Sequence, residues 1–327
     1  MIYKELNGGS DQVSRLGFGL WTLSTPGWGS RNTEDGVFLL RKAFDLGINL
    51  FDTVDSYGKG YSEELLSEAL GVVRKDLVIS TKVGLDFYSS DVNLRGQPEK
   101  KFDPDYIIYA CEQSLKRLHT DYIDMFHLYY PDLSDVERDD AFEAINRLKE
   151  DGKIVRWGAS LGDHGPTGEV AEILLDDREV DVLHLPYNLI EREPLKSLES
   201  RLSNLHTDVL VRRPHCFGML DGFLDVEDLD AEEYQNGGES IQLPENVSRA
   251  ISPAQHVVRL CRSNDLDPSR VAIQFILDSP LVSSILPNIL DYDSLNFYSE
   301  CFSGDESESG ITTEFIDSLG EFQSCQL

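Results

Sequence analysis

The feature that most constrains the fold is a regular alternation of short apolar runs with longer amphipathic stretches along most of the chain. Eight apolar runs predict strands at residues 15–20, 49–53, 76–84, 122–130, 154–160, 180–188, 208–214 and 282–288. Helical periodicity follows them at residues 33–47, 62–71, 103–119, 135–152, 166–178, 193–204, 268–279 and 291–302. Runs that are apolar nearly throughout are typical of parallel sheets covered by helices.

Eight strand–helix units in a chain of 327 residues favour a closed (β/α)8 TIM barrel over an open, doubly wound sheet. The glycines of GFGLWTL, residues 17–23, lack the GxGxxG spacing of a Rossmann turn, which argues against the open sheet. We therefore predict an α/β fold with one barrel domain over residues 1–302. Two segments lie outside this pattern. Residues 221–250 form a long acidic loop after the seventh strand, and residues 303–327 form an acidic linker and a C-terminal helical extension.

The formal net charge of −30 makes nucleic acid a poor partner. No run of 18 apolar residues is present, so we expect no membrane span. The five cysteines are scattered without a CxxC pair, which favours reduced thiols and argues against a metal site. With no signal-peptide pattern at the N-terminus, we expect a cytoplasmic protein. The pattern does not predict the oligomeric state.

Polar side chains stand where the predicted strands end, the place of the reactive groups in such barrels. Lys82 lies on an apolar strand, where an ammonium group is costly unless a carboxylate such as Asp52 pairs with it. A nearby lysine also favours ionisation of a phenol, so Tyr57 could donate a proton near neutral pH. The alternative is an Asp–Lys bridge that only closes the barrel mouth, with Tyr57 in a loop. Spacing alone leaves both interpretations open.

Several motifs resemble one enzyme family in the right order. GINLFDTVDSYGKGYSEELLSEAL (47–70) is similar to the signature block of the aldo-keto reductases, and LVISTKVG (77–84) and SLKRLHTDYIDMF (114–126) resemble their next two blocks. LGFGLWTL, KIVRWGAS, DVLHLPYNLIERE and SPLVSSILPN extend the resemblance over roughly residues 5–300. The combination of motifs is highly specific for this family.

The resemblance implies a (β/α)8 barrel that binds an extended nicotinamide dinucleotide, usually NADPH, and reduces a small aldehyde or ketone to an alcohol. Hydride passes from the nicotinamide to the carbonyl carbon while a tyrosine protonates the oxygen. By motif match, Tyr57 is that acid, Lys82 lowers its pKa, and Asp52 pairs with the lysine.

The family's catalytic histidine stands two residues before the Pro-Asp that follows the fourth strand. Counting from both flanks puts Tyr129 at that position. His127 lies two residues earlier on the same side of the strand, about 6.6 Å deeper, which is too far for direct proton transfer. We therefore expect Tyr129 at the catalytic end, as a donor to the carbonyl oxygen, and His127 as a core histidine with satisfied hydrogen bonds.

The resemblance implies cofactor contacts at Gly19, Trp21, Asp52, Ser160, His184, Arg212, Asn288 and Asp291. Several of these positions depart from the family. Leu161 replaces the asparagine that accompanies Ser160, His184 replaces a glutamine, and Arg212 replaces the aromatic residue that stacks on the nicotinamide. Asp291 and Asp293 stand near the expected adenosine 2′-phosphate, which carboxylates repel, so NADH competes with NADPH as the predicted cofactor.

Two functions fit these observations. The first is an NAD(P)H-dependent reductase with an altered catalytic tetrad, because Asp52, Tyr57 and Lys82 are all present. The second is a nucleotide-binding relative with little turnover and a sensing or regulatory role, suggested by the missing histidine and the altered phosphate block. The loops that set substrate choice give no identifiable substrate.

Overall fold

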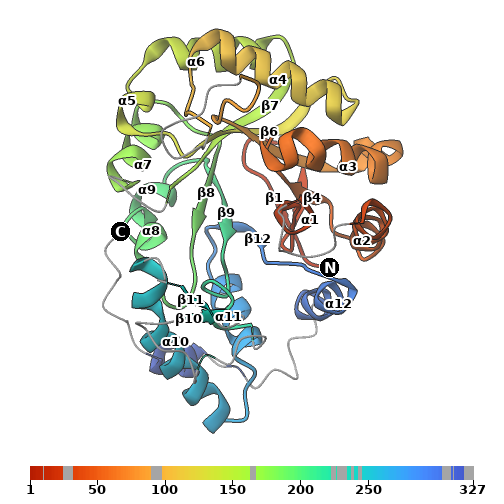
Figure 1. Ribbon diagram of the computed structural model, residues 1–327. Coiled ribbons are helices and arrows are strands. Elements are labelled where there is room, and N and C mark those ends of the chain that lie inside the picture. Colours follow the sequence, from red (N-terminus) through yellow and green to blue (C-terminus); the bar gives the residue numbers. More distant parts are fainter. Residues whose placement is uncertain are drawn as a thin grey trace.

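The computed structural model describes residues 1–9, 11–24, 32–89, 98–162, 167–221, 226, 234–236, 239–241, 245–303, 311 and 313–319. Eight parallel strands form one sheet in the order β12-β9-β8-β7-β6-β5-β4-β3. A parallel bridge joins Leu16, just before β3, to Ile285 in β12. The Gly17 amide donates to Ile285 O at 2.9 Å and the Ile285 amide donates to Arg15 O at 2.8 Å. These contacts close the sheet, so the predicted TIM barrel is confirmed (Figure 1).

All eight predicted apolar runs contain a strand of the barrel. The strands are β3 (Phe18–Gly19), β4 (Leu50–Asp52), β5 (Val78–Val83), β6 (Ile123–Tyr129), β7 (Ile154–Ser160), β8 (Val182–Pro186), β9 (Asp208–Arg212) and β12 (Val282–Leu286).

Helices surround the strands on the outside (Figure 1). The described helices are α1 (Trp21–Ser24), α2 (Thr33–Asp45), α3 (Tyr61–Leu70), α4 (Pro104–Leu118), α5 (Leu133–Val136), α6 (Asp139–Glu150), α7 (Thr167–Asp176), α8 (Glu193–Lys196), α9 (Glu199–Leu202), α10 (Glu245–Ser263), α11 (Pro268–Leu277), α12 (Tyr292–Cys301) and α13 (Thr313–Ser318), with 3-10 turns η1 (Tyr57–Gly60) and η2 (Gly71–Asp76). Two of the predicted helices, over residues 135–152 and 193–204, are each divided in two. Asp-Pro pairs begin α4 and α11, where Asp103 and Asp267 accept from backbone amides of the first turn.

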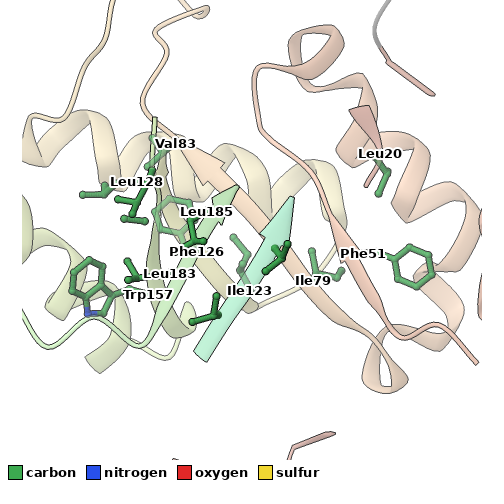
Figure 2. Packing of buried hydrophobic residues seen from close by; sticks show 14 of the residues in the cluster. Leu20, Phe51, Ile79, Val83, Ile123, Phe126, Leu128, Trp157, Leu183 and Leu185 are labelled. Carbon is green, nitrogen blue, oxygen red and sulfur yellow. The ribbon is translucent and has the colours of Figure 1, made fainter. Parts of the chain in front are cut away.

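Side chains alternate between the two faces of each strand. Those that face outward pack against the helices in one large apolar cluster, and Figure 2 shows Phe51, Ile79 and Phe126 among them. A separate apolar cluster lies inside the barrel. It includes the inward-facing side chains of Leu50, Val78, Met125, Val182, Leu210 and Leu286. Further along the strands, toward their carboxyl ends, the inward-facing side chains are mostly polar. These polar side chains form the candidate site described below.

An N-terminal hairpin, which the alternating pattern did not predict, closes the other end of the barrel. Its strands β1 (Tyr3–Glu5) and β2 (Gln12–Ser14) pair antiparallel. Leu6 and Val13 are buried in the interior cluster with the first residues of the barrel strands. This apolar plug leaves the carboxyl ends of the strands as the polar end of the interior.

The segment after β9 contains more regular structure than the predicted loop at 221–250. Its described part includes a hairpin of β10 (Tyr234–Asn236) and β11 (Glu239–Ile241), and α10 begins within it. The helix of the predicted C-terminal extension is α13, whose Ile316 is buried in a cluster with α10 side chains. Of the predicted acidic linker at 303–310, residues 304–310 lie outside the described residues. No helix among the described residues is long and apolar enough to cross a membrane.

Gly158 in β7 provides a test of how closely the barrel interior is packed. A Cβ atom at this position would lie 2.4 Å from His127 Nδ1 and 2.5 Å from the backbone oxygen of Val182. Because backbone cannot yield cheaply, we expect Gly158→Ala to lower the free energy of unfolding by about 1–3 kcal/mol in urea titrations.

The matched control is Gly168→Ala in α7, where a Cβ atom meets nothing within 4 Å. This change should leave the free energy of unfolding unaltered or raise it by up to about 1 kcal/mol, because alanine favours helix. Equal effects of the two substitutions would contradict the packing described for Gly158.

Candidate active site

A buried ion pair lies at the carboxyl ends of β4 and β5. Lys82 Nζ is 2.6 Å from Asp52 Oδ1, and the two residues are 1% and 7% exposed. Lys82 also donates to Thr53 O at 2.8 Å, and Ser80 Oγ donates to Asp52 Oδ1 at 2.6 Å. Burial lowers the pKa of Lys82 while Asp52 opposes this effect. The carboxylate and the added hydrogen bonds compensate for taking both charges out of water.

Tyr57 follows β4 at the start of η1, and its amide donates to Val54 O at 3.1 Å. After it the chain turns through left-handed conformations at Gly58 (φ 60°), Lys59 (φ 57°) and Gly60 (φ 97°). Burial is the main cause that raises the pKa of Tyr57. The nearby Tyr129 and the positive charge of Arg212 act in the opposite direction. The balance keeps the phenol protonated, the form that an acid needs.

Tyr129 ends β6, and its phenol lies close enough to that of Tyr57 for each to influence the pKa of the other. Burial, followed by the nearby Tyr57, raises the pKa of Tyr129, so its hydroxyl is neutral and available as a donor. The structure therefore brings together four side chains predicted from the sequence: Asp52, Tyr57, Lys82 and Tyr129.

Tyr130 is the residue at this site that the sequence analysis missed. Its ring stacks on that of Tyr129, with centroids 4.1 Å apart and an interplanar angle of 24°. Alternation along a strand would turn Tyr130 outward, but its φ of 56° interrupts the strand and keeps it beside Tyr129. Its amide donates to Ser160 O at 2.9 Å. The repeated tyrosine in the sequence YYPD was the available signal.

His127 lies one layer below Tyr129 and is fully buried. The predicted position in the core is confirmed, but the prediction of satisfied hydrogen bonds is wrong, because neither ring nitrogen has a partner. Burial, with a smaller effect of Lys82, lowers the pKa of His127 well below the ordinary value. The imidazole fits because Gly158, its partner in β7, has no side chain.

Ser160 and His184 are neighbours in the register of β7 and β8. Ser160 Oγ lies 3.5 Å from His184 Nδ1, while His184 Nε2 is buried without a partner. A bound carboxamide would offer this nitrogen both donor and acceptor atoms. Burial lowers the pKa of His184 well below its ordinary value, so the ring is neutral. This unpartnered atom at the strand ends fits a nicotinamide amide.

Arg212 extends from the end of β9 across the same end of the barrel. Its Nη2 donates to Leu161 O at 2.8 Å, and its guanidinium carbon lies 5.4 Å from the centre of the Tyr130 ring. Residue 161 is a leucine and has no side-chain amide, but its backbone oxygen accepts a hydrogen bond from the Arg212 guanidinium. Arg212 also opposes protonation of Lys82 and His184, which places its charge close to both.

The remaining predicted cofactor residues lie on the β3 and β12 side of the mouth. Gly19 ends β3 next to Asp52 in the register, and Trp21 Nε1 donates to Asn288 Oδ1 at 3.1 Å. Asp291 is exposed and caps α12, because its Oδ1 accepts from the Ser294 amide at 2.8 Å. This capping role is sufficient to explain an aspartate at position 291, and no bound ligand is needed to explain it. The described residues include no group of three or more His, Cys, Asp or Glu that could hold a metal ion.

The buried neutral imidazole of His127 predicts a pH dependence of stability. Its folded pKa is below the unfolded value of about 6.5, so the unfolded chain binds more protons and stability falls as the pH drops below that value. Between pH 7.5 and 5.0 this one site should cost about 2 kcal/mol, and His127→Leu should remove that loss in urea titrations.

The control is His206→Leu, a substitution of an exposed histidine, which should keep the pH dependence of the wild type. A wild type and a His127→Leu variant with the same change in unfolding free energy over this pH range would contradict a neutral His127.

The sequence and the barrel both resemble those of known proteins. Residues 15–298 match the sequence model of the Aldo/keto reductase family. The chain is 28% identical over 287 residues to aldo-keto reductase YhdN of Bacillus subtilis, covering 86% of this chain and 82% of the relative. It is 27% identical over 298 residues to L-glyceraldehyde 3-phosphate reductase of Escherichia coli, covering 88% and 83%. The solved holo form of an aldo-keto reductase from Bacillus halodurans has a similar fold, with a TM-score of 0.80 at 23% identity over 99% and 98% of the two chains.

Proposed function

We propose a function for this chain on the basis that it belongs to the Aldo/keto reductase family. It reduces an aldehyde or ketone to the alcohol, with Tyr57 as the proton donor. The observation that carries the proposal is the buried Lys82–Asp52 pair at 2.6 Å beside Tyr57. A barrel does not need a buried ion pair for stability, because apolar residues of similar volume pack as well or better.

Tyr57 acts as a general acid toward the carbonyl oxygen. Its raised pKa keeps the proton in place before the reaction, and the nearby Tyr129 favours the phenolate that remains after transfer. The positive charge of Arg212 favours that phenolate as well, and we assign the same effect to Lys82 on the resemblance of its motif. Asp52 holds the lysine in position and balances its charge.

Tyr129 takes the place of the histidine that the family uses. Its neutral hydroxyl lies beside that of Tyr57, so it can donate to the same carbonyl oxygen and orient the carbonyl. The hydroxyl cannot carry the charge that a protonated histidine could, and His127 is too deep in the barrel to replace it.

A nicotinamide dinucleotide, when bound, supplies the hydride. Ser160 and His184 would hold the carboxamide, with the unpartnered His184 Nε2 as the main contact, and Arg212 would face the ring with its guanidinium plane. Gly19, Trp21, Asn288 and Asp291 would lie along the rest of the molecule. Their role is proposed on the resemblance of their motifs.

The alternative of a dinucleotide-binding protein without turnover is less favoured. Loss of catalysis would leave no reason to keep a lysine, an aspartate and a tyrosine together at this position. In this chain they remain joined, and Tyr129 adds a neutral donor at the point where the histidine is missing.

The proposal is tested by carbonyl reduction in the presence of NADH or NADPH, with a panel of small aldehydes and ketones. Tyr57→Phe should lower kcat by about 10²–10⁴-fold, because the acid is lost while the ring is kept. Cofactor binding, followed by quenching of tryptophan fluorescence, should change by less than about threefold. A wild type that binds neither cofactor, or a Tyr57→Phe variant with wild-type kcat, would contradict the proposal.

The acidic first turn of α12 predicts a preference for NADH. Asp293 and Asp291 are exposed at this turn, where they would repel a 2′-phosphate. We expect a lower Kd for NADH than for NADPH, and Asp293→Arg should tighten NADPH binding about tenfold with little effect on NADH.

The control for charge is Asp105→Arg, which makes the same substitution in the first turn of α4 and should leave both Kd values unaltered. If Asp293→Arg and Asp105→Arg change NADPH binding equally, the effect belongs to net charge and not to this turn.

A further inference from the structure

The turn that carries Tyr57 is not rigid by itself. The three residues after Tyr57 are Gly58, Lys59 and Gly60, and their φ angles are positive, at 60°, 57° and 97°. Two of them are glycines, which restrict the backbone little. The left-handed backbone of Lys59 costs free energy and persists only where the surroundings enforce it. The position of Tyr57 therefore depends on contacts at the two ends of this turn.

Ser62, in the first turn of α3, makes such contacts. Its side chain is fully buried, and its Oγ donates to Val54 O and to Tyr57 O, each at 3.3 Å. A hydroxyl has one proton, so the two carbonyls share this donation. Val54 O also accepts from the Tyr57 amide at 3.1 Å. Both polar groups of the Tyr57 backbone are therefore held at this one serine.

Thr53 joins Ser62 to the buried ion pair. Its Oγ1 donates to Ser62 Oγ at 2.6 Å, and its backbone oxygen accepts from Lys82 Nζ at 2.8 Å. Its amide donates to Ser80 O in β5 at 2.8 Å, and its side chain is fully buried. A continuous run of hydrogen bonds therefore leads from Lys82 through Thr53 and Ser62 to the backbone of Tyr57.

Glu63, the next residue of α3, fixes the same turn of the helix from another side. Its Oε1 accepts from Thr81 Oγ1 at 2.6 Å, and its Oε2 accepts from Arg117 Nε at 2.7 Å. Thr81 precedes Lys82 in β5, so the first turn of α3 is joined to the strand that carries the lysine. Ser62 therefore extends from a fixed support.

We propose that Ser62 is a positioning residue of the reduction, which sets where Tyr57 stands relative to Lys82 and to the carbonyl oxygen. The inference rests on the proposed function. Ser62 has no exposed surface, so it acts through Tyr57 and not by contact with the substrate. Proton transfer needs heavy atoms within about 3 Å of each other, and a misplacement of about 1 Å can lower the rate about 100-fold.

The test uses Ser62→Ala, which removes the hydroxyl that holds Tyr57. In a stopped-flow single turnover of cofactor-loaded protein, hydride transfer should be about 10–100-fold slower than in the wild type. The cofactor Kd should change by less than about twofold, because the proposed carboxamide contacts, Ser160 and His184, lie on β7 and β8. A slower reaction with unaltered binding is the sign of a misplaced acid.

The matched control is Ser14→Ala in β2, which removes another fully buried hydroxyl at the opposite end of the barrel. Ser14 Oγ donates to Leu16 O at 2.7 Å and accepts from the Asn49 amide at 3.1 Å. This substitution should lower the urea midpoint of unfolding, as Ser62→Ala does, but keep the wild-type hydride-transfer rate within about twofold.

A second pair of variants tests the same run of hydrogen bonds, also where Ser62→Ala does not fold. Thr53→Val keeps the shape of the side chain and removes its hydroxyl, and hydride transfer should be at least about fivefold slower than in the wild type. Thr53→Ser keeps the hydroxyl and loses a methyl group, and it should transfer hydride at least about threefold faster than Thr53→Val. A role in packing alone predicts the reverse order, because serine leaves a cavity.

Ser62 has no positioning role if Ser62→Ala keeps the wild-type hydride-transfer rate, if Ser14→Ala slows it equally, or if Thr53→Ser is slower than Thr53→Val. In each of these cases the wild type still turns over and Tyr57→Phe is still impaired, so the proposed reductase activity stands. A wild type that binds cofactor and reduces no carbonyl would overturn the function and the positioning role together.

Discussion

The ion pair of Lys82 and Asp52 is the constraint on which the rest of the site depends. An ammonium group with 1% exposure inside an apolar barrel is tolerated only beside a carboxylate and with its other hydrogen bonds satisfied. Removing one partner of such a pair typically costs about 3–5 kcal/mol, because the other charge is left buried. The pair therefore fixes the relative position of β4 and β5, and with it the turn that carries Tyr57.

The barrel interior changes character from one end to the other. The N-terminal hairpin and the first inward residues of the strands form an apolar plug, which includes Val13, Leu50 and Met125. Above it lie neutral imidazoles and the ion pair, and the tyrosine hydroxyls stand at the mouth. The same residue type thus has different consequences by depth. His127 is fully buried in a layer that lowers the pKa of its ring, whereas Tyr129, two residues later, lies near Tyr57 at the mouth.

Much of this site could be predicted from sequence because strand alternation and motif order are local properties. The eight strands, the inward direction of Asp52 and Lys82, and the position of Tyr129 nearer the mouth than His127 all follow from counting residues. Tyr130 could not be predicted in this way, because its left-handed backbone depends on contacts with β7 and β9 that are distant in the chain. The partners of the His127 ring depend likewise on what surrounds it in space. The terminal hairpin was missed because its strands are too short to show a period.

We assign the buried pair of Lys82 and Asp52 a role in proton transfer and not in cofactor binding. The most direct measurement is a stopped-flow single turnover of Lys82→Met loaded with NADH or NADPH, against the wild type. We predict a folded variant with a cofactor Kd within about threefold of wild type and hydride transfer slower by at least about 100-fold. A Lys82→Met variant that binds cofactor and transfers hydride at the wild-type rate would contradict it.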